Sequence, residues 1–333
     1  MSYGRVNKPR FYPDAVNWLA SRGWSKADKL GLSVAGDAYG FAAGSNIYQI
    51  FDLNPLNTAT ISADTETDEG VIQIDWTVTG NMPITFVAIL NHNFATADVA
   101  VILQSDAAAV TEYDGGEIQS LVPVLGCETH TIGPASGAIK CTTAGDGDLI
   151  ATCVATNEQY NGIVLYPVDG SFDADITIGS IIIGSHYTMP NSGEMGVGRP
   201  VEFDGVRVRT TDGGKRYGHA SWIAGNDGNA YAPFKSQTCF RRPAGRRCYD
   251  IDFEYIADTD LFSDDPSANA SETDFFYNVP NKTAGPLLPF IWTPDSTSTT
   301  EGDYMFARLM NDFKPTKIAN NVYRFTNRIE EEL

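Results

Sequence analysis

Short segments in which apolar and polar residues alternate recur along most of this sequence. In residues 71–79, Ile72, Ile74, Trp76 and Val78 alternate with polar side chains, which is the pattern of a β-strand with one buried face. Turn residues separate further strand-like segments, which lie at 85–90, 99–103, 149–155, 162–168 and 176–184. Strands at this spacing with no helices between them predict an antiparallel sandwich rather than βαβ units.

A second group of strand patterns follows a segment rich in Gly, Pro and small polar residues at 188–200. These patterns lie at 205–211, 249–255, 274–279, 303–310 and 321–331. A long loop at 293–303 interrupts the group. The arrangement predicts a second β-rich unit of about 130 residues, which is an ordinary domain size.

One helix is expected near the N-terminus, where Pro13 and Asp14 begin it and Gly23 ends it. No stretch approaches 18 apolar residues, so no membrane insertion is expected, and the N-terminus lacks the pattern of a secretory signal.

The expected fold class is therefore all-β. It comprises a basic N-terminal arm with a short helix (1–30), a jelly-roll-like β-sandwich (31–190) and a barrel-like β domain (191–333). Residues 1–12 are expected either to extend onto a neighbouring subunit or to fray.

Charge is unevenly distributed over a chain whose net charge is −19. Residues 1–30 carry +4 and 199–247 carry +6, whereas 31–198 carry −19 and 248–333 carry −10. The acidic total argues against nucleic acid as a partner, because such binding depends on neutralising phosphates. Alternating blocks of opposite charge favour self-assembly, and a solvated acidic surface is the alternative.

The five cysteines have no spacing typical of a zinc site. Cys141 and Cys153 flank the Gly-Asp-Gly-Asp turn at 145–148, so a disulfide between them is one possibility. We favour small buried thiols in a protein made in a reducing cytoplasm.

Sequence motifs of catalysis are missing: there is no H-E-x-x-H, G-x-S-x-G, Walker A or Rossmann fingerprint. The segments 145–148 and 225–229 faintly resemble calcium loops, but Asp-Gly and Asn-Gly are common turn residues. Scattered carboxylates include no evident acid–base pair, which makes a glycosidase the weakest hypothesis. We predict no enzyme activity, no cofactor and no catalytic, cofactor-binding or metal-ligating residues.

Asn91, His92 and Asn93 form a possible ligand loop, because they follow a predicted strand where binding groups often lie. His92 and His186 are conceivable as a metal pair if their strands are neighbours. The favoured interpretation is that the three loop residues hydrogen-bond a tight turn.

A basic and aromatic cluster is the candidate interface. Its residues are Lys235, Phe240, Arg241, Arg242, Arg246, Arg247 and Tyr249. Such a cluster suits phosphate or single-stranded nucleic acid, but the acidic chain favours a contact with the acidic block of another subunit.

Two long segments carry a family resemblance. IQIDWTVTGNMPITFVAILNHNFATADVAVILQSD and YNGIVLYPVDGSFDADITIGSIIIGSHYTMP resemble galactose-binding-like jelly rolls in bacteriophage tail proteins. RCYDIDFEYIADTDLF, TAGPLLPFIWTPD and the final NRIEEEL are similar to the β-barrel hub domains of distal-tail and baseplate proteins. The resemblance covers residues 47–333 and consists of strand rhythm rather than a diagnostic motif.

The resemblance implies a non-enzymatic virion structural protein in the tail tip, baseplate or tail adaptor of a tailed phage. Its expected partners are copies of itself and other virion tail proteins, with host-surface glycan as a further possibility. It would be made in the host bacterial cytoplasm and located in the virion tail. The alternative is a glycan-binding, lectin-like jelly roll, with or without a calcium ion, whose melting temperature would rise with sugar or Ca²⁺.

Overall fold

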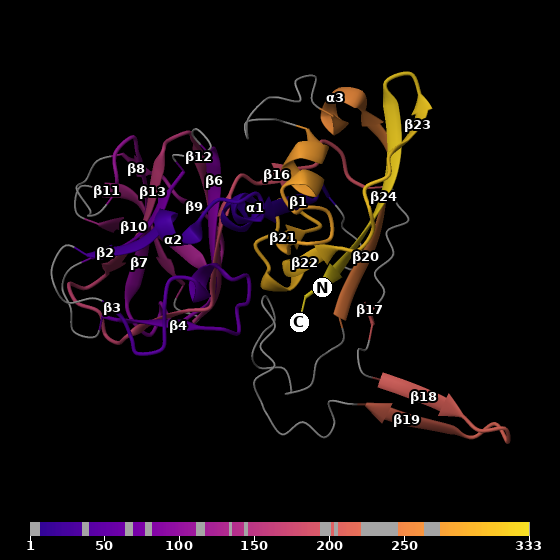
Figure 1. The fold of residues 1–333 in the computed structure, drawn as a ribbon, viewed down its shortest axis with the longest axis horizontal. Helices are drawn as coiled ribbons and strands as arrows, with labels where there is room; N and C mark the ends of the chain where they lie inside the picture. The colour runs from indigo at the N-terminus through magenta and orange to yellow at the C-terminus, as the bar shows by residue number, and fades with distance from the viewer. Residues whose placement is uncertain are drawn as a thin grey trace.

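Strands dominate the computed structural model of this chain (Figure 1), which confirms the all-β expectation. The structure describes residues 7–34, 40–63, 69–76, 82–110, 117–132, 135–142, 146–193, 201–202, 206–220, 246–262 and 274–332. The strand pairs within this part of the chain are antiparallel. They form a first unit with several sheets and a second unit built on one sheet.

The first unit is a β-sandwich with two principal sheets. The larger sheet contains, in spatial order, β10 (Cys127–Ile132), β11 (Ala135–Cys141), β7 (Val99–Asp106), β13 (Tyr160–Pro167), β5 (Gly70–Asp75) and β2 (Leu30–Val34), with β8 (Ile118–Gln119) beside β7. The smaller sheet contains β15 (Ser180–Gly184), β6 (Ile84–His92), β12 (Gly147–Thr156) and β9 (Val122–Leu125). A third, short sheet contains β14 (Ile176–Ile178), β4 (Ala59–Ser62) and β3 (Gly40–Phe41).

Alternation along the strands explains how the two principal sheets bury a common core. Ile72 and Ile74 of β5 and Leu103 of β7 lie in one cluster with Val87 and Ile89 of β6. Each of these side chains is fully buried. Burial of these apolar faces drives the two sheets together. The polar residues that alternate with them along each strand face away from the shared core.

The predicted strand at 176–184 is in fact two strands in different sheets. β14 pairs with β4, and β15 pairs with β6, so the chain changes sheet at Gly179. A Cβ atom at this position would lie 2.3 Å from the carbonyl oxygen of Pro55. The Gly179 N–H donates to the carbonyl oxygens of Leu90 and Asn91, which fixes the corner.

One sheet forms the second unit. Its described strands run in the order β16 (Tyr187–Thr188), β1 (Arg10–Pro13), β21 (Phe290–Thr293), β22 (Met305–Leu309), β24 (Val322–Glu331), β20 (Arg246–Ala257) and β17 (Val201–Glu202), with β23 (Thr316–Ala319) beside β24. Its core is rich in aromatic side chains, and Phe275 stacks on Phe325 with ring centroids 4.9 Å apart.

The N-terminal segment is an integral part of both units rather than an arm. β1 lies between β16 and β21, with Phe11 opposite Trp292, and both Phe11 and Tyr12 are fully buried. The predicted helix is confirmed as α1 (Ala15–Ser21), which begins at the N-cap Asp14. α1 packs Trp18 and Leu19 into the core of the sandwich. Because these apolar side chains are buried in the two cores, residues 10–21 pack against the rest of their own chain rather than against a neighbouring subunit.

The two units share an apolar cluster at their junction. Tyr12 of β1 contacts Phe86 of the sandwich with ring centroids 5.0 Å apart, and Tyr304 and Phe306 of the second unit join them. Beside this contact, the fully buried Lys282 donates to Ser185 Oγ at 2.6 Å. Such a shared interior favours one rigid arrangement of the units over free relative motion.

Helices are short and lie outside the sheets. Besides α1 they are α2 (Lys26–Lys29), η1 (Gln49–Phe51), α3 (Asp258–Leu261), η3 (Tyr277–Asn281) and η4 (Glu301–Asp303). The prediction of a strand at 274–279 is therefore wrong, because this segment is helical. The Asp274 carboxylate accepts a hydrogen bond from the Tyr277 N–H at 2.7 Å, which caps the turn. In the described ranges, no helix has the length and apolar character needed to cross a membrane.

None of the cysteines that the structure describes forms a disulfide. They are Cys127, Cys141, Cys153 and Cys248. Cys141 is therefore not bonded to Cys153, and it instead lies opposite Cys127 across β10 and β11. Cys239 lies outside the described residues. Cys127, Cys141 and Cys248 are buried as expected, whereas Cys153 is partly exposed.

Candidate functional site

Asn91 and Asn93 of the predicted ligand loop form hydrogen bonds within the chain. Asn91 Nδ2 donates to the Pro55 carbonyl at 2.7 Å, and its backbone N–H donates to Asp148 Oδ1 at 2.9 Å. Asn93 Oδ1 accepts from the Thr177 N–H at 2.7 Å. The left-handed φ of 52° at Asn91 suits asparagine, which adopts this conformation more readily than most residues. These contacts close the corner where β6 ends.

His92, between them, is buried with 4% of its surface exposed. Its ring stacks on Phe94, and Nδ1 accepts the Phe94 N–H at 3.2 Å. Burial lowers the pKa of His92 to about 3, so the imidazole is neutral at physiological pH. Cys141 Sγ lies 3.9 Å from Nε2. These contacts give the three residues a structural role at the turn, and sugar binding by the loop stays a prediction.

The other candidate metal ligands also form contacts within the chain, with Asp146 near His92 at one end of β6 and His186 beside Thr85 at the opposite end. Asp146 accepts from both the N–H and Oγ1 of Thr96, at 3.0 and 2.6 Å, so the 145–148 segment serves as a turn. His186 Nδ1 lies 2.8 Å from Thr85 Oγ1, and burial lowers its pKa to about 4. No three His, Cys, Asp or Glu side chains within the described ranges gather as metal ligands. The second calcium-like segment, 225–229, lies outside those ranges.

Only three residues of the predicted interface lie in the described part of the chain, all on β20. Lys235, Phe240, Arg241 and Arg242 fall outside it. Tyr249 is 5% exposed and packs against Trp292, with ring centroids 4.6 Å apart. The prediction that Tyr249 contacts a partner is therefore wrong, because its side chain is part of the core of the second unit. For the four undescribed residues the interface stays a prediction.

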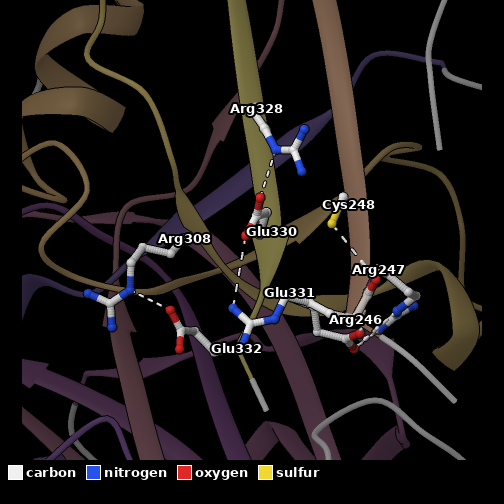
Figure 2. A network of polar contacts seen from close by, with 8 residues as sticks. All are labelled: Arg246, Arg247, Cys248, Arg308, Arg328, Glu330, Glu331 and Glu332. Carbon is white, nitrogen blue, oxygen red and sulfur yellow. Dashed lines mark hydrogen bonds and ion pairs between the residues drawn. The ribbon is translucent and has the colours of Figure 1, made fainter. Parts of the chain in front are cut away.

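Arg247 also points into its own chain, where it forms a buried ion pair with Glu331 (Figure 2). Its Nη2 lies 2.7 Å from Glu331 Oε1, and its backbone N–H donates to Oε2 at 3.1 Å. The guanidinium also donates to the carbonyls of Gly302 and Tyr304, each at 2.7 Å. Arg247 therefore ties the end of β24 and the 301–304 turn to β20, rather than meeting a partner.

The other face of the β20–β24 ladder carries a row of ion pairs. Arg328 Nε lies 2.7 Å from Glu330 Oε1 and its Nη1 lies 3.7 Å from Asp250 Oδ1. Arg246 Nη1 lies 3.9 Å from Glu330 Oε2 (Figure 2). The Arg246 side chain is 26% exposed, compared with 12% for Arg247. Basic side chains of one strand here lie next to acidic side chains of its neighbour, which stabilises antiparallel pairs.

A basic hairpin that the sequence analysis did not single out projects from the second unit (Figure 1). It consists of β18 (Val206–Thr210) and β19 (Arg216–Ala220), which pair only with each other among the described strands. Every residue from 208 to 216 is exposed, including Val208. The period-two pattern predicted β18 itself, but sequence gave no signal that β18 and its partner strand would leave the sheet.

Comparison with known proteins gives no family assignment. No protein-family model matches the chain, and no curated protein matches it.

Several solved structures match about half of the chain. Chitosan-binding module 1 of a chitosanase/glucanase from Paenibacillus sp. IK-5 is 15% identical, with 47% of this chain and 93% of the module covered and a TM-score of 0.28. A CBM32-1 from a family 31 glycoside hydrolase of Clostridium perfringens is 12% identical, with 46% and 94% covered and a TM-score of 0.25. The CBM32-1 and CBM32-2 domains of Clostridium perfringens ZmpB with GalNAc are 10% identical, with 55% and 40% covered and a TM-score of 0.29. Because these TM-scores are below 0.5, the sandwich is assigned from this chain's own strand pairing.

Proposed function

We propose that this chain is a non-enzymatic structural protein that assembles with copies of itself, as part of the tail of a tailed bacteriophage. The observation that carries the self-assembly is the basic hairpin of β18 and β19. A two-stranded hairpin is marginally stable alone in water, and this one has an exposed valine and no sheet to join within the described chain. Such an element gains stability when it packs on a partner.

Two further features support a structural role. The sandwich and the sheet share an interior at Tyr12 and Phe86, which favours one rigid arrangement of the two units. His92 in the predicted loop and His186 at the other end of β6 both have a pKa lowered by burial, so they are neutral and poor proton donors.

The assignment to a phage tail, and synthesis in the host bacterial cytoplasm, come from the resemblance of strand rhythm described above. The position in the tail tip, baseplate or adaptor follows from that resemblance and carries over no site residue. Its test is a pull-down of the tagged chain from infected cells, with tail proteins expected among the bound partners.

The hairpin supplies the direct test. A variant in which a short Gly-Ser link replaces residues 206–220 should fold normally, because residues 208–216 are exposed. Light scattering should give a defined oligomer for the full chain and a smaller species for the variant, and circular dichroism should show that the variant is folded. Equal masses would contradict the proposal.

Sugar binding by the sandwich is the second candidate, because the matched structures are carbohydrate-binding modules. Two of these structures are complexes with chitotriose and with GalNAc, so these two sugars are the ones to test for binding. A ligand that binds only the folded state raises the melting temperature, and the same measurement with Ca²⁺ tests calcium dependence. A monomer that either sugar stabilises would favour this candidate over assembly.

A further inference from the structure

Cys127 and Cys141 lie directly opposite each other in the larger sheet of the sandwich, as Cα partners at one end of the β10–β11 ladder. Both side chains belong to the cluster between the two principal sheets, so the two thiols lie on the same face of the ladder. Two thiols that face each other in this way are able to react with each other as well as with an outside reagent.

The hydrogen bonds of the ladder show which kind of cross-strand pair the two cysteines form. The Thr142 N–H donates to the Gly126 carbonyl at 3.2 Å, one residue beyond the cysteines on each strand. In an antiparallel ladder, bonds that flank a pair mark the closely spaced type, whose Cα atoms are about 4.5 Å apart. A disulfide needs Cα atoms about 4.4–6.8 Å apart. The backbone at this pair therefore has the spacing that a disulfide requires.

The other described cysteines lie elsewhere in the fold. Cys153 is on β12 in the smaller sheet, where its thiol donates to the Ile84 carbonyl at 3.7 Å. Cys248 is in the second unit, opposite Glu330. Among the cysteines of the described ranges, Cys127 and Cys141 are thus the two that share one ladder.

Only weak contacts hold the two sulfur atoms in their present positions. The Cys127 thiol donates to the Ile150 carbonyl at 3.4 Å, and Cys141 Sγ lies 3.9 Å from Nε2 of His92. Sulfur is a weak donor and a weak acceptor, so a covalent bond between the two atoms would cost little in lost hydrogen bonding.

Burial makes the reaction of these thiols slow. It raises the pKa of Cys127 to about 11 and that of Cys141 to about 12, and the neighbouring Cys127 adds to the second rise. The thiolate is the reacting form, so few molecules react at any moment near neutral pH. The cysteines keep exposed fractions of 9% and 8%, and β10 is the last strand of its sheet in the described chain. A small oxidant therefore reaches the pair through local opening at this edge.

We propose that Cys127 and Cys141 are an oxidisable pair, which a low-molecular-weight disulfide such as oxidised glutathione converts to a cross-strand disulfide in the folded chain. One cysteine thiolate attacks a sulfur of the oxidant, breaks its S–S bond and forms a mixed disulfide, and one thiol is released. The second cysteine attacks the cysteine sulfur of the mixed disulfide, which forms the new S–S bond and releases the second thiol. The two electrons and two protons lost by the cysteines are held by the two released thiols.

The bond would fasten β10 to β11 and close a loop of about 15 residues, 127–141. A closed loop limits the unfolded chain, so the oxidised protein should melt roughly 5–10 °C higher than the reduced protein. The chain would be made with free thiols and would become stiffer after it leaves a reducing cell. This inference goes beyond the proposed function and does not depend on it, because the pair lies in the sandwich and the basic hairpin projects from the second unit (Figure 1).

Peptide mapping of the wild-type chain tests the bond directly. The folded protein is incubated at pH 8 with oxidised glutathione, and the remaining thiols are then blocked under denaturing conditions. Cleavage after Lys140 separates Cys127 from Cys141, and cleavage before Asp146 separates Cys141 from Cys153. Mass spectrometry should find the peptide that ends at Lys140 joined to the peptide 141–145, and reduction should separate them. The rate of joining should rise from pH 7 to pH 9, because the thiolate fraction rises.

Alanine variants and melting curves supply the controls. C127A and C141A should each lose the joined peptide and the rise in melting temperature on oxidation, whereas the matched control C153A should keep both. Circular dichroism shows that each variant is folded, and the wild-type map needs no variant. The inference is overturned by a folded wild-type chain that stays reduced, that joins Cys127 to Cys153, or that holds glutathione on either cysteine without the cross-strand bond. None of these results affects self-assembly, which the hairpin variant tests by its mass.

Discussion

Replacing Glu331 with glutamine should destabilise the second unit more than any exposed change of charge. The side chain is 1% exposed, and it accepts three hydrogen bonds from Arg247, whose own side chain is 12% exposed. Removing one partner of a buried ion pair leaves the other charge without compensation, at a cost of roughly 3–5 kcal/mol. Arg247 keeps its bonds to the Gly302 and Tyr304 carbonyls, so we expect about 3 kcal/mol.

Urea unfolding followed by circular dichroism measures this loss as a change in the free energy of unfolding. The double variant R247M/E331M removes both charges and should lose less than E331Q alone, because no unpaired charge remains buried. The matched control is D312N, which breaks the pair of Asp312 and Lys314, whose side chains are 71% and 80% exposed. Solvent screens that pair, so D312N should change little. If E331Q unfolds at the same urea concentration as D312N, the reasoning about this pair is refuted.

Three further predictions concern the interior. Burial lowers the pKa of Lys282 to about 7, so the unfolded chain binds its proton more tightly, and the free energy of unfolding should rise between about pH 7 and 10 by up to about 1.4 kcal/mol per pH unit. Urea titrations at pH 7, 8 and 9 should show this slope in the wild type and a smaller one in K282M; equal slopes would disprove it. G179A should cost about 1–3 kcal/mol, because its Cβ atom would meet the Pro55 carbonyl, and an unchanged melting temperature would be the contrary result. Burial raises the pKa of Cys127 to about 11 and of Cys141 to about 12, so both thiols should react with a thiol reagent at pH 8 far more slowly than in urea, and equal rates would contradict their burial.

Strands that alternate in hydrophobicity could be predicted from the sequence because the signal is local. The segments at 85–90, 99–103 and 162–168 became β6, β7 and β13. Residues 274–279 were misassigned because Phe275 and Phe276 favour strands, whereas a cap from Asp274 and packing against Phe325 decided the helix. Local preference is overridden where tertiary contacts of this size compete with it.

Long-range pairing could not be predicted. Nothing near Phe11 in the sequence indicates that β1 lies between strands about 175 and 280 residues away. The ion pair between Arg247 and Glu331 could not be predicted either, because in the sequence Arg247 belongs to a basic cluster far from Glu331. Charge clusters describe composition, and only the sheet register decides which members face solvent.

The solution mass of the purified full chain tests the account most directly. Native mass spectrometry across a range of protein concentrations should give one fixed multiple of 36.1 kDa. Light scattering at rising salt should show the multiple dissociating, because screening weakens exposed charge pairs. A monomer at every concentration and at low salt would contradict the claim that this chain assembles with copies of itself.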